Sequence, residues 1–356
     1  MADKSEVLSG LRERMPWQVA RPILKEIGTP RAMGWENTIA RIEDDETITN
    51  EQVDELSEAL IEHQVTGEKM CRFYQLDDAE IEELRDATEG LEIVEGPMAD
   101  IYPVPLQEDA LANLPADHRE LVSVEESGDG LAAVFCSVRE KPTRDVIDPD
   151  SLPEHLQDYF DEYDELIAYR LDRQQAFDVV WIPEDGNVID VRTDFPKHTE
   201  LERARHAQHR LLTGFRDAVG VDPFGEPINL FPIIRDMYGT DAEGRVVELA
   251  FGTTTRSLKH EKMRRNRDCL RTETYHVGGK EALATELQLY KVSIAYTYPH
   301  SPDFSSHPEL SLHSTSLVAD NPNPQLFDAV IRKTVGLDDY NHVRERILHF
   351  INEFGD

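Results

Sequence analysis

The first 90 residues carry apolar side chains at the three-to-four-residue spacing of amphipathic helices. Such stripes occupy residues 7–11, 19–27 and 33–42. Thr49 with Gln52, and Asp77 with Glu80, form capping boxes that begin two further helices. The pattern predicts a small helical domain over residues 1–76, followed by a connecting helix and a proline-rich linker over residues 77–120.

Beyond residue 120 the apolar period changes to two, which is typical of half-buried strands. A long helix over 199–219, a helix that begins with Asn323 and Pro324, and a final apolar helix interrupt this pattern. Strands are predicted at 121–124, 131–138, 166–171, 177–182, 188–191, 246–255, 270–276, 288–298 and 310–318. Residues 121–220 then form a central α/β region and residues 221–356 a β-rich region with closing helices. The predicted class is α+β, with helices first and a mainly antiparallel sheet after them.

Charge changes this picture only locally. The 356 residues include 71 Asp and Glu against 37 Lys and Arg, a net charge of −34. Acidic residues spread along the whole chain, with only ten lysines, indicate adaptation to a high-salt cytoplasm. The three cysteines are isolated, which argues against disulfides and thiolate metal sites. Without an apolar run of membrane-spanning length, we expect a cytoplasmic protein with no membrane partner.

Motifs for catalysis are absent, so we expect no catalytic residues, no metal and no cofactor. Neither a phosphate-cradling glycine loop nor a metalloprotease or nucleophile-elbow motif occurs. The strongest enzyme signal is Asp178 with Asp190 and Arg192, which leaves a metal-dependent nuclease as an alternative. An arginine cannot act there as a base. His206 and His209 share a helix face, but arginines beside them would repel a metal ion, so this helix end is interpreted as a basic surface.

Two basic segments depart from the acidic background and define the candidate DNA contacts. The first is the run 256–271, whose alternatives are a solvated loop, a site for nucleic-acid phosphates, or a docking site for an acidic partner. The second lies in residues 1–41, where basic side chains outnumber acidic ones. Together with the start of the long helix, the candidates are Arg12, Arg14, Arg21, Lys25, Arg31, Arg41, Arg203, Arg205, Arg256, Lys259, Lys262, Arg264, Arg265 and Arg267.

Strand 288–298 alternates strictly and provides a candidate protein–protein surface. Tyr290, Val292, Ile294 and Tyr296 fall on one face of it, with polar residues on the other. This face is predicted to be a dimer interface, with a protein-interaction module that does not bind DNA as an alternative function. The same pattern is also compatible with ordinary core packing.

The order of elements resembles that of the inner-kinetochore proteins centromere protein N and centromere protein L. The likeness rests on the Met15-Pro16 and Pro22-Ile-Leu-Lys25 segments, the helix end at 59–64, the segment 69–76, and the strand running into Asn-Pro-Gln-Leu-Phe-Asp-Ala-Val near residue 323. It covers both ends of the chain and the domain order.

The resemblance implies a prokaryotic relative of that family: a pyrin-like helical domain joined to a β-rich domain, without enzymatic activity. It implies binding of double-stranded DNA in a basic groove between the domains, and pairing through C-terminal β elements as a homodimer or a paralogous heterodimer. Arg12, Arg14 and Arg31 fall in segments that match DNA-facing segments of the family. We therefore expect a nucleoid-associated DNA-binding scaffold, and chromatin proteins are a further class of partner that the family admits.

Overall fold

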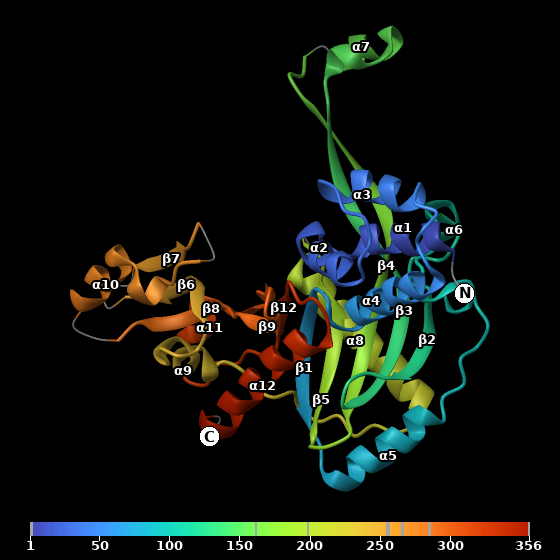
Figure 1. Ribbon diagram of the computed structural model, residues 1–356. Helices are drawn as coiled ribbons and strands as arrows, with labels where there is room; N and C mark the ends of the chain where they lie inside the picture. The colour runs from blue at the N-terminus through green and yellow to red at the C-terminus, as the bar shows by residue number, and fades with distance from the viewer. Residues whose placement is uncertain are drawn as a thin grey trace.

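The computed structural model describes residues 3–160, 162–197, 199–253, 257–264, 267–283 and 286–354 (Figure 1). It confirms the α+β class, with helices preceding a large antiparallel sheet. Among the described residues, no helix combines the length and apolar character needed to cross a bilayer.

Four helices form the N-terminal domain: α1 (Lys4–Arg14), α2 (Trp17–Glu26), α3 (Gly34–Glu43) and α4 (Asn50–Thr66). They enclose a core that includes Val7, Leu11, Leu24 and Leu56, each almost fully buried. The predicted capping box at the start of α4 is present, because Thr49 Oγ1 accepts from the Gln52 amide at 3.2 Å. The apolar stripes that predict these helices are therefore the helix faces that are buried in this core.

The remaining chain is built on a 10-stranded sheet in the order β2-β3-β4-β5-β1-β12-β11-β8-β6-β7, and β9 and β10 pair separately. Its strands are β1 (Lys69–Gln75), β2 (Arg119–Glu126), β3 (Gly130–Ile147), β4 (Leu166–Pro183), β5 (Val188–Asp194), β6 (Arg245–Gly252), β7 (Leu258–Lys262), β8 (Gln288–Ala295), β9 (Tyr298–Ser301), β10 (Phe304–Ser306), β11 (Glu309–His313) and β12 (Ala329–Arg332). The other helices are α5 (Asp78–Glu89), α6 (Glu108–Ala112), α7 (Glu154–Phe160), α8 (Leu201–Val219), α9 (Ile233–Gly239), α10 (Thr274–Glu281), α11 (Ser316–Ala319) and α12 (Leu337–Phe354), with short 3₁₀ turns at Ala99–Ile101, Pro149–Ser151 and Leu270–Thr272.

The two sheet faces are covered differently. One face, which we call the α8 face, carries Phe135 and Val180, which pack with α5 and α8. The opposite face carries Phe177 under the 99–114 segment and, farther along the sheet, Val292 and Ile331 under α9 and α12. The strand period of two thus assigns alternate residues to separate cores.

β3 and β4 extend far beyond the body of the sheet as a two-stranded arm that ends in α7 (Figure 1). Their pairing continues without interruption from Gly130 with Pro183 to Ile147 with Leu166. The predicted strands 131–138 and 166–171 fall within this hairpin, which is much longer than either prediction.

Several sequence predictions differ from the fold. The predicted strand 310–318 ends as β11 at His313, and its last residues begin helix α11. The segment 69–76, assigned to the helical domain, is mostly strand β1, which lies between β5 and β12 in the sheet. The predicted strand 270–276 is a 3₁₀ turn followed by α10, whose start is capped by the Glu273 side chain at the His276 amide. The helix predicted after Asn323 is instead strand β12, because its apolar residues Ala329 and Ile331 complete the sheet between β1 and β11.

Candidate nucleic-acid interface

Most basic residues of the N-terminal domain are placed where a polyanion could reach them. Arg12, Arg21, Lys25, Arg31 and Arg41 are all exposed. Within the described ranges none of these five forms an ion pair, although Arg41 donates to the Arg31 carbonyl at 2.9 Å. In an acidic chain, five cations without acidic partners form an available positive surface.

Arg14, predicted to contact DNA, is instead nearly buried against the sheet. Its guanidinium lies 2.5 Å from the Asp194 carboxylate and 3.0 Å from the Gln175 carbonyl, with a side chain only 10% exposed. Lys69 contacts the same carboxylate at 3.3 Å and is fully buried. Arg14 therefore fastens α1 to the sheet and is not available to a phosphate. Its sequence position, next to exposed Arg12, gives no sign of this burial.

The basic run 256–271 is divided among several environments. Arg256 and Arg265 lie outside the described residues. Lys259 lines a cavity of about 240 Å³ between β7 and α10. Lys262 is 67% exposed and contacts Glu248 at 3.2 Å. Arg264 and Arg267 follow β7 and are exposed.

The last residue of the run, Arg271, has a structural role. Its guanidinium donates to the carbonyls of Tyr238, Gly244, Met237 and Glu243, at distances between 2.6 and 3.0 Å. Four carbonyl acceptors satisfy this side chain, so it ties α9 to the turn before β6 and leaves nothing to offer a ligand.

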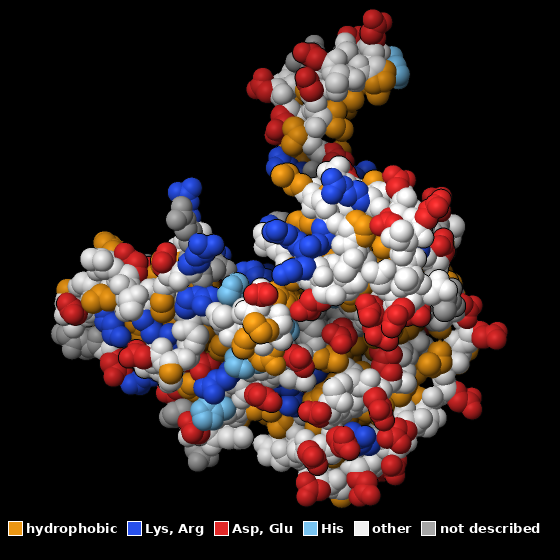
Figure 2. All heavy atoms as spheres, in the orientation of Figure 1, with side chains coloured by type: hydrophobic (Ala, Val, Ile, Leu, Met, Phe, Trp, Pro, Cys, Tyr) orange, Lys and Arg blue, Asp and Glu red, His pale blue; other side chains and the backbone are white. Residues whose placement is uncertain are grey.

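The two basic segments face each other across a hollow. α2 and the end of β7 stand on opposite sides of β12 (Figure 1), and Lys and Arg side chains gather on both sides of the space between them (Figure 2). We call this space the basic hollow; the elements that flank it carry the exposed cations Arg21 and Lys25, on α2, and Arg264 and Arg267, after β7. By contrast, the visible surface around α5 is dominated by Asp and Glu (Figure 2).

Two further cations lie at the end of β12 beside the hollow, and sequence reasoning missed them. Arg332 contacts Glu68 at 3.4 Å and lies over the Phe195 ring at 4.8 Å. Lys333 pairs with Glu309 and adopts a left-handed backbone at φ 61°. Because both are ion-paired, they contribute less free charge than the cations on the walls. Two adjacent cations in an acidic chain are the only sequence signal for them.

Arg203 and Arg205 do not join the hollow. Arg203 contacts Glu200 at 3.1 Å and donates to the Glu140 carbonyl at 2.9 Å, which places it beside the base of the arm. Arg205 contacts Asp328 at 2.6 Å and Glu202 at 2.7 Å. Their acidic partners already occupy both side chains.

The dimer interface predicted on strand 288–298 is largely core. Val292, Ile294 and Tyr296 are 1%, 0% and 4% exposed and pack with α9 and α12, so they cannot meet a second chain. Tyr290 is half-buried and leaves the core pattern, because a bulge in the β6–β8 pairing brings Leu289 inward in its place. The strict alternation therefore reports burial within the chain.

Asp178 and Asp190, the acids of the nuclease alternative, lie on opposite faces of the sheet. Trp181, with Asp190 directly across from it, faces away from α8, whereas Asp178 shares its face with Val180. Asp178 accepts from Arg139 at 2.5 Å, and Asp190 accepts from Arg344 at 2.8 Å and Arg192 at 3.0 Å. These two carboxylates cannot hold one metal ion between them. No set of three or more His, Cys, Asp and Glu side chains among the described residues is arranged to hold a metal ion.

The chain was compared with protein families, curated proteins and solved structures. No family model, curated protein or solved structure matches it.

Proposed function

We propose that this protein is a non-catalytic scaffold that binds double-stranded DNA in the basic hollow. The observation that carries the proposal is that exposed cations, with no acidic partner in the described part of the chain, stand on both flanks of one hollow, on α2 and after β7, in a chain of net charge −34. A duplex presents phosphates along two strands, so it can engage both walls at once. A small anion would need only one of them.

Salt dependence is the first test of this function. Neutralising about six phosphates makes affinity fall by roughly 10⁵ for a tenfold rise in salt. We expect fluorescence anisotropy with a labelled duplex to show a slope of about −5 in log affinity against log salt concentration. A flat salt dependence, or no binding at any salt concentration, contradicts the proposal. In a high-salt cytoplasm, two linked sites would be required to hold the DNA.

The arm provides a surface on which two copies could be linked. Antiparallel pairing sets Val146 opposite Ile167 and Pro142 opposite Leu171, so these residues share one face with Tyr169. Val146, Ile167, Tyr169 and Leu171 are 57%, 44%, 71% and 60% exposed. The other face is polar, with Arg170 contacting Asp172 at 3.0 Å. An isolated two-stranded ribbon is marginally stable in water, so this apolar face favours an occupant.

We assign that occupant to a second copy of the chain. A twofold axis through the arm packs one patch against itself, so no other surface is required. Arg144, in the central part of this face, lies directly across from Tyr169 and contacts Glu165 at 3.7 Å. In a face-to-face pair, Arg144 of each copy can cover the Tyr169 ring of the other, a favourable cation–π arrangement.

Light scattering tests the dimer. We expect the wild type to have twice the chain mass of 40.7 kDa. The double substitution Tyr169→Ser/Leu171→Ser should return it to the monomer mass, because it removes the largest apolar groups of the face. Tyr290→Ser, on the strand first predicted to be the interface, is the matched control and should leave the mass unchanged. A wild-type monomer at all protein concentrations contradicts the assignment.

A further inference from the structure

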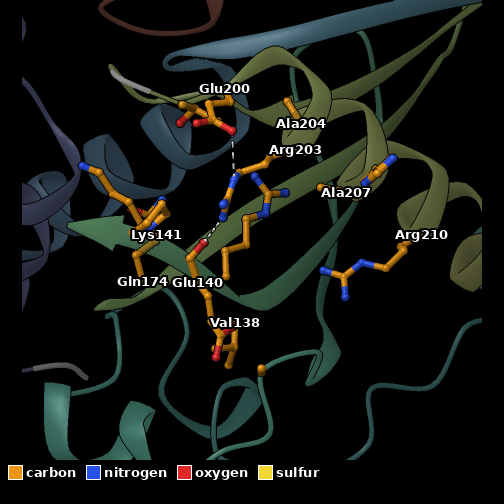
Figure 3. Close-up of a pocket in the computed structure, with 14 residues that line it drawn as sticks. Val138, Glu140, Lys141, Gln174, Glu200, Arg203, Ala204, Ala207 and Arg210 are labelled. Carbon is orange, nitrogen blue, oxygen red and sulfur yellow. Dashed lines mark hydrogen bonds and ion pairs between the residues drawn. The ribbon is translucent and has the colours of Figure 1, made fainter. Parts of the chain in front are cut away.

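A cavity of about 500 Å³ lies between the first half of α8 and the base of the arm (Figure 3). Part of its lining is apolar, from Val138 and Pro142 on β3 and Ala204 and Ala207 on α8. A volume of this size is within the range of small-molecule sites, which are typically apolar with a few placed polar groups. It is separate from the basic hollow and has no place in the proposed DNA-binding function.

The polar lining of this cavity is predominantly positive. Arg139, Lys141, Arg203 and Arg210 line it, against Glu140 and Glu200, with His206 beside them. The lining thus carries four cations against two carboxylates, in a chain whose net charge is −34, and Asp178 behind it pairs with Arg139. The cavity lining is therefore positive where most of the protein surface is negative, and this difference sets the cavity apart from the acidic surface.

Some of these cations are already held in place and others are not. Arg139 binds Asp178 at 2.5 Å and the Asp194 carbonyl at 2.7 Å, and Arg203 is held between Glu200 and the Glu140 carbonyl. In the described part of the chain, the side chains of Lys141 and Arg210 form no ion pair or hydrogen bond. Arg210 extends from α8 toward β3 (Figure 3). The cavity therefore combines fixed cations with others free to bind a ligand.

A further guanidinium crowds the same region. Arg119 donates to the Arg210 backbone carbonyl, which brings it to the end of the cavity that Arg210 lines. Burial, and then the charge of Arg210, lower the pKa of Arg119, and Arg139 acts in the same direction. A bound anion would reduce the repulsion between these cations.

We propose that this cavity binds a phosphomonoester that carries a planar or apolar group. A phosphomonoester is close to a dianion at neutral pH and matches Lys141 and Arg210, the two lining cations without an acidic partner in the described part of the chain. Its three terminal oxygens accept from Arg210 and Lys141, with Arg139 and Arg203 adding their field, and the organic group lies against Ala204, Ala207 and Pro142. A carboxylate offers one charge and two oxygens, which leaves part of this cationic lining without a partner.

Calorimetric titration of the full chain at fixed ionic strength tests the proposal, with AMP, phenyl phosphate and inorganic phosphate as probes. We expect AMP and phenyl phosphate to bind, and inorganic phosphate to bind at least tenfold more weakly because it cannot use the apolar lining. Arg210→Gln/Lys141→Gln should weaken AMP binding about 100-fold, since each lost charged hydrogen bond weakens binding about tenfold. Arg205→Gln, on the same helix but outside the cavity, should leave it unchanged.

Three results would overturn the proposal. One is no binding of AMP or phenyl phosphate, and another is equal binding by the double variant and the wild type. The third is displacement of AMP by a short DNA duplex, together with loss of duplex affinity in the double variant, since the cavity would then be a contact for nucleic-acid phosphates. A tryptophan substitution, Ala207→Trp, fills the cavity and provides an independent variant that leaves every cation in place. It should abolish AMP binding while duplex binding stays at the wild-type level.

Discussion

Reversing two charges on one wall of the basic hollow, with Arg21→Glu/Lys25→Glu, should lower duplex affinity by about 100-fold at low salt. Both side chains are exposed on α2 and have no ion pair in the described part of the chain, so the substitutions break no internal contact that the structure shows. Two effects lower the duplex affinity: two phosphate contacts disappear, and the two new carboxylates repel the duplex. The slope of log affinity against log salt should become shallower by about 2. Fluorescence anisotropy across a salt series measures both quantities.

A matched variant separates this effect from a general change in net charge. Arg235→Glu/Lys280→Glu alters the charge by the same amount on α9 and α10, which carry none of the cations that flank the hollow. Among the contacts of the described residues, it removes only the pair of Arg235 with Glu286 and the contact of Lys280 with Tyr238. Duplex affinity should stay within about twofold of the wild type, since charges beyond a Debye length of roughly 10 Å are screened. Equal losses in both double variants would show a response to net charge alone, and the hollow would then not be the site. Arg264→Glu/Arg267→Glu, on the other wall, should reproduce the effect of the α2 variant.

The alternative in which the hollow docks an acidic protein predicts a different pattern. A protein partner needs charge of suitable sign and position but not the regular spacing of phosphates. The α2 variant would then bind duplex DNA as the wild type does, and weakly in both cases. The salt series therefore discriminates between the two functions before any partner is known.

The fold was predictable from sequence where one pattern determined both local structure and burial. The capping box at Thr49 and the apolar stripes of α1 to α3 needed no knowledge of distant contacts. β1 could not be assigned in this way. Its apolar segment is too short to distinguish a strand from a helix, and only its pairing with β5 and β12 decides that it is a strand. The segment after Asn323 fails for the same reason: its helix-start signal is overridden by sheet pairing.

The candidate sites show a similar division. Local charge density correctly marked exposed cations such as Arg21 and Arg264, because an excess of positive charge in an acidic chain is visible without the fold. It could not separate them from Arg14, whose partner Asp194 is 180 residues away along the chain. The cavity beside α8 is likewise assembled from β3, β4 and α8, so no continuous segment of the sequence predicts it.

Asp194 is the centre of a buried charge cluster that joins the helical domain to the sheet. It lies opposite Lys69 in the β1–β5 pairing and accepts from Arg14 on α1. Burial alone would raise its pKa, but Arg14, Lys69 and Arg139 outweigh burial and lower the pKa to about 2. Conversely, burial is the main cause that lowers the pKa of Lys69. One carboxylate thus compensates Arg14 on α1 and Lys69 on β1, and its removal leaves both buried without a counter-charge.

We expect Asp194→Asn to destabilise the protein by about 3–5 kcal/mol at neutral pH, because it leaves Lys69 and Arg14 buried without their anion. Chemical denaturation measures the change, and Asp303→Asn, at an exposed turn acid, should alter the free energy of unfolding by less than about 0.5 kcal/mol. The pH dependence supplies a second readout. The folded-state pKa lies near 2, below the ordinary value of 3.8, so the unfolded chain takes up the proton first as pH falls. The stabilisation is present above about pH 4 and is lost progressively as pH falls toward 2, so the difference between the wild type and Asp194→Asn should shrink over that interval. A difference that stays constant from pH 7 to pH 2 would show that the carboxylate charge does not hold the two domains together.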